Sequence, residues 1–132
     1  MSPLITNLTQ LEAFYISNNL ITGYITPKFR IGNMKRLMYL NLSNNSIVGQ
    51  IPSTIGYLIN LASLDLGWNQ ISGSIQVEIS NCSMLDYLNL SHNNLTGSIP
   101  SKIGDLPFLS HIDLSYNNLT GNIPLSLIIS LT

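Results

Sequence analysis

The sequence predicts a repeat solenoid of the α/β type, in which stacked coils share one hydrophobic core. The pattern L-x-x-L-x-L-x-x-N occurs five times, and successive copies are spaced by 26, 24, 24 and 24 residues. Each copy is followed by glycine and, two residues later, by isoleucine. Repeats of this length form stacked supersecondary units rather than a conventional globular domain. The copies begin at Leu11, Leu37, Leu61, Leu85 and Leu109.

The first element predicted in each coil is a short strand. In the second copy, Leu40 and Leu42 flank Asn41. This alternation has the period of a strand, so the two leucines are expected to point inward and the residue between them outward. A single coil cannot bury its own apolar side, and the coils must therefore stack.

An asparagine that recurs in every copy of the repeat lies where the chain leaves each predicted strand. A side-chain amide there can bond the open backbone groups of neighbouring coils and form a buried ladder. The glycine that follows permits a backbone conformation that a side chain would strain. Proline after isoleucine in three copies fixes a backbone dihedral on the back of the coil. The ladder residues are Asn19, Asn45, Asn69, Asn93 and Asn117.

The repeats place the whole chain, residues 1–132, in one array. A partial coil, 1–10, precedes the coils that start at 11, 37, 61, 85 and 109, and a second partial coil spans 124–132. The last one is out of phase, because Leu127 corresponds to Ile103 but Ser130 to Leu106. No capping segment, secretory signal or membrane span is recognisable, so we expect a piece of a longer array.

Charge and cysteine content exclude several classes of site. The net charge of −1 gives no general attraction to nucleic acid or to an anionic membrane. Four cations, Lys28, Arg30, Lys35 and Arg36, are expected on a solvated outer loop rather than at a ligand. Cys82 is the only cysteine, which excludes an internal disulfide and a cysteine-rich metal site and predicts a small buried hydrophobe.

The strings LNLSNNSIVGQIPSTIG, LNLSHNNLTGSIPSKIG and IDLSYNNLTGNIP resemble plant-specific leucine-rich repeats. The resemblance is closest to the ectodomains of plant leucine-rich repeat receptor-like kinases. It implies a right-handed superhelix with a short-stranded parallel sheet on the concave face and mostly irregular or 3-10 segments on the convex side. The paired cysteine caps, the transmembrane segment and the kinase domain of these receptors are not recognisable in this sequence, so we do not expect it to signal by itself.

The resemblance also implies a function. It favours a non-catalytic module that binds a peptide or protein in signalling or defence. The module would lie on the extracellular side of the plasma membrane or in the apoplast. Its partners would include a co-receptor with the same repeat. A serine/threonine kinase domain belonging to a full-length parent would lie outside this chain. Two alternatives stay open: a protein resembling polygalacturonase inhibitors, and a truncated receptor fragment without independent function.

Candidate ligand-binding residues lie at the outward strand positions and just before the ladder asparagine. Neighbouring strands lie ~4.8 Å apart, so Trp68, His92 and Tyr116 are expected to form a stacked aromatic strip with Tyr87 and His111 beside it. Exposed aromatic groups suit peptide or protein recognition, although ordinary variation between repeats would also explain them. The complete candidate set is Tyr39, Asp65, Trp68, Tyr87, His92, His111, Asp113 and Tyr116.

No catalytic residue, cofactor or metal is predicted. The serines are repeat positions, and the glycines belong to the repeat or to its back-turn. His92 and His111 lie in adjacent coils but in different columns, an arrangement that does not favour a shared metal.

Seven N-x-[ST] sequons fit an extracellular glycoprotein, although the repeat consensus itself generates such sequons. Asn41 and Asn89 fall on the predicted binding face, where a glycan would obstruct a ligand, and Asn44 carries a further sequon. The expected glycosylation candidates are Asn7, Asn81, Asn94 and Asn118.

Overall fold

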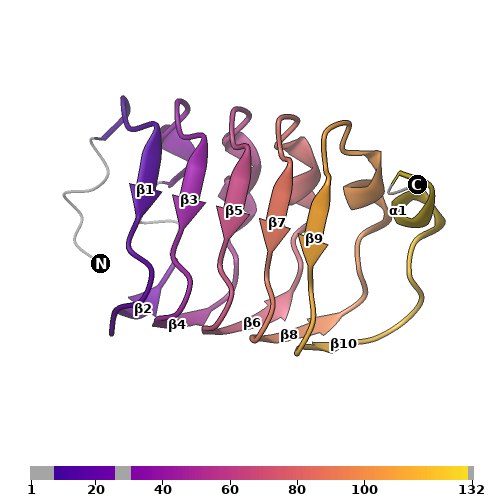
Figure 1. Ribbon diagram of the computed structural model, residues 1–132. Coiled ribbons are helices and arrows are strands. Elements are labelled where there is room, and N and C mark those ends of the chain that lie inside the picture. The colour runs from indigo at the N-terminus through magenta and orange to yellow at the C-terminus, as the bar shows by residue number, and fades with distance from the viewer. Residues whose placement is uncertain (1–7, 26–30, 131–132) are drawn as a thin grey trace.

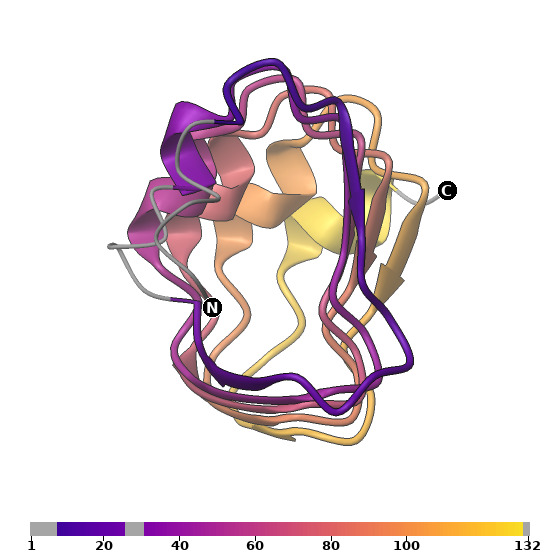
Figure 2. The same ribbon diagram turned by 90° about the vertical axis from the view of Figure 1, so that its left-hand side faces the viewer.

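A computed structural model describes residues 8–25 and 31–130. The chain winds into a row of similar coils (Figure 1). Viewed along the row, strands form one side of each coil and short helices the opposite side, and a second set of strands closes the base (Figure 2). The predicted fold class, a repeat solenoid with parallel strands and 3-10 segments, is confirmed.

The first sheet contains one three-residue strand from each coil. The middle residue of each strand faces the core, and the strands pair in parallel so that Leu40 lies beside Leu64 and Leu88 beside Ile112. The outer surface of this sheet is the concave face. Its strands, in spatial order, are β1 (Ala13–Tyr15), β3 (Tyr39–Asn41), β5 (Ser63–Asp65), β7 (Tyr87–Asn89) and β9 (His111–Asp113).

The sequence did not predict the second parallel sheet. The segment after each ladder asparagine is extended, and because the coils repeat, equivalent segments lie side by side and exchange backbone hydrogen bonds. The glycine in this segment has a positive φ in every coil, for example 86° at Gly49 and 76° at Gly97, which other residues rarely adopt. The strands are β10 (Asn118–Leu119), β8 (Asn94–Gly97), β6 (Gln70–Ser74), β4 (Ser46–Gly49) and β2 (Thr22–Tyr24).

Short helices form the convex side. Pro52 and Pro100 stand in extended conformation immediately before two of them, and Gln76 adopts the same conformation before a third without proline. Within the described part of the chain, no helix is long and apolar enough to cross a membrane. The 3-10 helices are η3 (Ile31–Asn33), η4 (Ser53–Tyr57), η5 (Val77–Asn81) and η6 (Ser101–Asp105).

The last coil ends in an α-helix, α1 (Leu125–Ser130), where the earlier coils have 3-10 helices. It packs against η6: Leu127 is buried, and the Ser126 hydroxyl donates a hydrogen bond to the Ser101 carbonyl at 2.8 Å. Leu127 thus takes the place that Ile103 takes one coil earlier, as the repeat alignment predicted.

The core runs along the length of the stack. Leu88 and Leu90 are fully buried, whereas Leu114, which matches Leu90 one coil later, is only partly buried. Cys82 is also fully buried, and its thiol donates to the Ile55 carbonyl at 3.3 Å. Burial raises the pKa of this thiol to about 12, so it packs as an apolar side chain, as expected.

Candidate functional site: a stacked aromatic row on the concave face

The asparagine ladder provides the support for the concave face. The Asn93 amide donates hydrogen bonds to the carbonyls of Leu66 (3.0 Å), Leu90 (3.2 Å) and Ser91 (3.1 Å), and its oxygen accepts the Ile71 N–H at 2.9 Å. The amides of Asn45, Asn69 and Asn117 likewise join their own coil to the preceding one. The backbone that leads out of each strand is held in place by these bonds.

The residue before each ladder asparagine has a left-handed backbone conformation. Its φ is 58° at Asn18 and 53° at Asn44, and it is 53°, 51° and 53° at Trp68, His92 and Tyr116. Asparagine and histidine adopt this conformation more often than other residues, whereas for tryptophan and tyrosine it is uncommon and costs free energy. Sequence reasoning missed this feature, although asparagine at this position in the first two coils was a signal for it.

The same turn is tied to the next coil through the backbone. The Trp68 N–H donates to the Ser91 carbonyl at 2.9 Å, and the Asn69 N–H donates to the His92 carbonyl at 3.1 Å. The ladder amides and these bonds together over-determine the strained conformation. They fix the direction in which each ring leaves the backbone.

As a result, the rings of Trp68, His92 and Tyr116 are stacked on one another. The Trp68 and His92 ring centroids lie 3.6 Å apart with an interplanar angle of 17°, and His92 and Tyr116 lie 4.0 Å apart at 12°. Trp68 is 58% exposed and Tyr116 74% exposed. We call these three residues the aromatic row.

The other aromatic candidates lie on the strands beside the row. The rings of Tyr87 and His111 are tilted at 34° with centroids 6.2 Å apart. Tyr39 is separated from Tyr87 by Ser63, which pairs with both in the sheet. Tyr39 is therefore exposed but stands apart from the row.

The two aspartate candidates also hold the backbone turns in place. Asp113 Oδ1 accepts hydrogen bonds from the Ser115 N–H (3.0 Å) and hydroxyl (2.6 Å), and the hydroxyl is the main reason why the pKa of Asp113 is lowered. Asp65 Oδ1 accepts only the Gly67 N–H (3.0 Å) from its own coil, and burial raises the pKa of Asp65. Equivalent residues of the repeat thus have opposite pKa shifts.

The polar groups around His111 do not form the relay of a hydrolase. The Ser110 hydroxyl lies 2.9 Å from His111 Nδ1 and donates to the Asp86 carboxylate. A catalytic triad needs the carboxylate on the histidine, with the histidine accepting the serine proton. Among the described residues, no group of three or more histidine, cysteine, aspartate or glutamate side chains could hold a metal ion.

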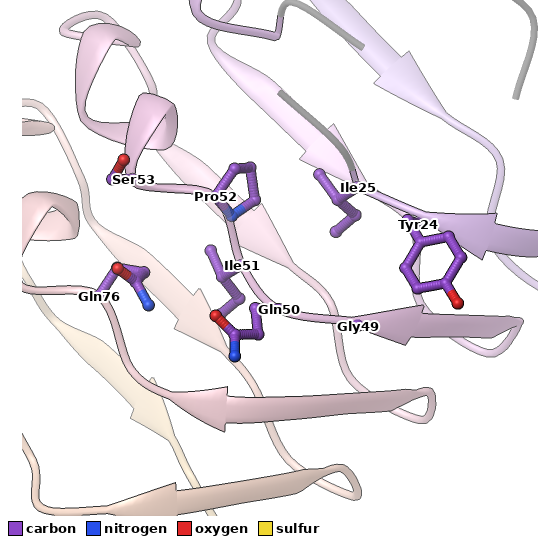
Figure 3. Close-up of a pocket in the computed structure, with 8 residues that line it drawn as sticks. All are labelled: Tyr24, Ile25, Gly49, Gln50, Ile51, Pro52, Ser53 and Gln76. Atoms are coloured by element: carbon purple, nitrogen blue, oxygen red, sulfur yellow. The ribbon is translucent and has the colours of Figure 1, made fainter. Parts of the chain in front are cut away.

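Two hollows in the surface differ in polarity. One, of about 420 Å³, opens on the concave face at the Trp68 end of the row and is lined by Asn18, Ser43, Asn44, Asp65, Trp68 and Asn89. The other, where β2, β4 and the segment before η4 meet (Figure 3), has no charged side chain among the described residues that line it. It is lined by Tyr24, Ile25, Gly49, Gln50, Ile51, Pro52, Ser53 and Gln76.

The remaining predicted residues are dispersed. Lys28, Arg30 and Asn7 lie outside the described residues. Arg36 forms an ion pair with Glu12 at the edge of the first sheet, and Lys35 is exposed. Of the other sequon asparagines, Asn41 and Asn89 are half-buried, whereas Asn44, Asn81, Asn94 and Asn118 are exposed.

Comparison with known proteins identifies the repeat. Models of the leucine rich repeat match residues 36–58 and 60–119, which together exceed half of the chain. Receptor-like protein EIX1 of Solanum lycopersicum is 41% identical over 71 residues, which cover 54% of this chain and 7% of that protein. The chain spans between 4% and 9% of the length of such curated relatives.

Two solved structures show the same fold over nearly the whole chain. The ectodomain of the Arabidopsis thaliana receptor kinase GASSHO1/SCHENGEN3, in complex with CASPARIAN STRIP INTEGRITY FACTOR 2, is 40% identical with a TM-score of 0.93, over 99% of this chain and 16% of that one. The Arabidopsis receptor kinase HAESA, in complex with the peptide hormone IDA and the co-receptor SERK1, is 36% identical with a TM-score of 0.91, over 96% and 21%. The chain therefore belongs to the leucine-rich repeat family, and its repeats are of the kind that forms the ectodomains of plant receptors.

Proposed function

We propose that the concave face binds a peptide or a protein segment, with the aromatic row as its anchor. The observation that carries this proposal is the row itself: three stacked, solvent-accessible rings held by a backbone that the ladder fixes. Tyrosine and tryptophan dominate binding hot spots. Rings that are already held in place lose little conformational entropy when a ligand covers them.

Similarity to plant receptors supports the same assignment. Both solved structures above are complexes, one with a peptide hormone and a co-receptor. We infer a comparable role for this chain, as a non-catalytic recognition segment of a plant receptor-like protein that faces the apoplast and needs no cofactor. Its partner would be a peptide or a second leucine-rich repeat protein.

Replacing the row by asparagine tests this role. Asparagine occupies the same left-handed position in the first two coils, so the variant Trp68→Asn, His92→Asn, Tyr116→Asn is expected to fold. Linear peptides selected from a random display library on the unmodified protein should bind this variant about 30-fold more weakly or worse, the loss of roughly 2 kcal/mol that marks a hot spot.

A convex-side variant provides the matched control. Tyr57 and Phe108 are exposed aromatic residues outside the first sheet, and Tyr57→Asn, Phe108→Asn should leave peptide binding unchanged. Circular dichroism checks that each variant is folded. Peptides that bind the row variant as tightly as the unmodified protein would show that the row is not the anchor.

Glycan mapping tests the extracellular placement. Asn81 lies at the end of η5 on the convex side and is exposed, whereas Asn41 and Asn89 use their side-chain oxygens to accept hydrogen bonds from the turns on the concave face. Protein secreted from plant cells should therefore carry a glycan at Asn81 and none at Asn41 or Asn89. Glycopeptide mass spectrometry measures occupancy, and glycans on the concave face would contradict a binding role for it.

A further inference from the structure

The coil that contains β5 departs from the repeat at two adjacent positions. The other four coils have serine two residues after the strand, at Ser17, Ser43, Ser91 and Ser115, whereas this coil has Gly67. The next residue is Trp68, the only tryptophan of the chain. Both departures lie beside the concave-face hollow at the end of the aromatic row.

The glycine removes a hydrogen-bond donor from Asp65. At three of these positions the serine hydroxyl donates to the last residue of the strand, at 2.7 Å on Asn41, 2.7 Å on Asn89 and 2.6 Å on Asp113. Asp65 has no such hydroxyl in its own coil. It accepts the Gly67 N–H at 3.0 Å, and the side chains of Ser43 and Asn89 in the neighbouring coils counteract part of the effect of burial on its pKa.

Asp65 is a half-buried carboxylate that accepts one hydrogen bond from its own coil, whereas Asp113 accepts two. Despite these donors, burial raises the pKa of Asp65, while the pKa of Asp113, which keeps its hydroxyl donor, is lowered. Gly67 cannot simply be exchanged for a larger residue, because a Cβ there would lie 2.8 Å from Asn89 Nδ2. A positive group placed in the hollow would offset the cost of burying this carboxylate.

Trp68 supplies an aromatic wall to the same hollow. His92 covers one side of its ring, and in the preceding coils the equivalent residues are Asn44 and Asn18, which are shorter than a ring. The Asn44 amide donates to Asn18 Oδ1 at 2.7 Å, so Asn44 Oδ1 is available to accept. An aromatic face, a carboxylate and an amide oxygen together suit a planar cation that donates several hydrogen bonds.

We propose that this hollow binds an arginine side chain of the ligand, with the guanidinium stacked on Trp68 and hydrogen-bonded to Asp65. The inference rests on the proposed function of the same face and specifies its ligand as a basic peptide segment. Arginine fits better than lysine, because its guanidinium is planar, stacks on aromatic rings and presents its donors as a fork. It would extend the aromatic row by a fourth layer.

The charges of the described surface agree with a basic ligand. Asp65, Asp86 and Asp113 lie on or beside the first sheet, where the described cation Arg36 is paired with Glu12. Lys35 and Lys102 lie on the side of the short helices. None of the described residues that line the hollow is cationic.

The fluorescence of Trp68 reports directly on this site. The full chain is titrated with a capped Gly-Arg-Gly peptide and with the same peptide carrying citrulline, the neutral isostere of arginine, or lysine. We expect a saturable change with the arginine peptide and an affinity about tenfold higher than for the citrulline peptide, with lysine between them. Equal affinities for arginine and citrulline would overturn the proposal.

Substitutions at equivalent positions separate the site from the general charge of the face. Asp65→Asn keeps an acceptor for the Gly67 N–H, as Asn41 and Asn89 do in their coils, and should abolish the preference for arginine over citrulline. The matched control Asp113→Asn should retain it. An undiminished arginine preference in folded Asp65→Asn protein would also overturn the proposal.

Failure of the arginine site can be told apart from failure of the proposed binding face. Library peptides that depend on the aromatic row but show no arginine preference would overturn the arginine site and leave the binding face in place. An arginine preference that depends on Asp65, without row-dependent library peptides, would support the site and count against the wider face.

Discussion

Replacing Asn93 by alanine is expected to destabilise the folded chain by about 3 to 5 kcal/mol. Asn93 is buried and makes four hydrogen bonds, two of them to Leu66 and Ile71 of the preceding coil. Alanine would leave these buried backbone groups without partners, and each unsatisfied group costs about 1–3 kcal/mol. Urea unfolding followed by circular dichroism measures the loss.

Asn19 is the matched control, because it occupies the same position of the repeat in the first described coil. It is exposed, and within residues 8–25 and 31–130 its amide donates only to Ile16 and Ser17 of its own coil. Water can replace these partners, so Asn19→Ala should cost roughly 1 kcal/mol or less. If Asn93→Ala and Asn19→Ala lowered the free energy of unfolding by similar amounts, hydrogen bonds between coils would not be the source of the stability that the ladder provides.

Truncating Leu90 to alanine should have an effect of similar size for a different reason. Leu90 is fully buried between neighbouring coils. Its replacement removes apolar contact area and leaves a cavity that the stacked coils on both sides cannot fill, which typically costs about 2 to 5 kcal/mol. Because each coil contacts only its neighbours, the loss should also reduce the cooperativity of unfolding. Calorimetry reports both quantities.

Leu114 tests whether position along the stack, rather than residue type, sets this cost. It is the same residue at the same repeat position but is only partly buried. Leu114→Ala should therefore destabilise the chain by about half as much or less. If Leu114→Ala lowered the free energy of unfolding as much as Leu90→Ala does, burial between a coil on each side would not be what sets the cost.

The predictions that succeeded were those in which one residue type has one physical role in every coil. Leu40 and Leu88 face the core because alternate residues of a strand point to opposite faces, and only one face of this sheet is buried. The ladder amides lie where the chain leaves the strand, and their neighbours are fixed by the repeat. The spacing of 24 residues also places Trp68, His92 and Tyr116 beside one another, because equivalent positions of adjacent coils are neighbours in space.

Other features depended on backbone geometry that residue types do not encode. The second sheet arises because extended segments of adjacent coils, such as β4 and β6, lie side by side. The left-handed conformation of Trp68 is imposed by bonds from the next coil. The binding site remains a prediction, and the structure adds that Asp65 and Asp113 also hold the turns.

The sequence by itself determined the coil, the direction of its core residues and the columns that face outward, because these follow from periodicity along the chain. Only the tertiary structure decided how side chains from adjacent coils are arranged relative to one another. The fixed direction of the rings, the contrast between Asp65 and Asp113, and the hollow between Trp68 and Asp65 depend on groups supplied by adjacent coils. Burial and hydrogen bonding are properties of these contacts between coils, and a single repeat does not contain them.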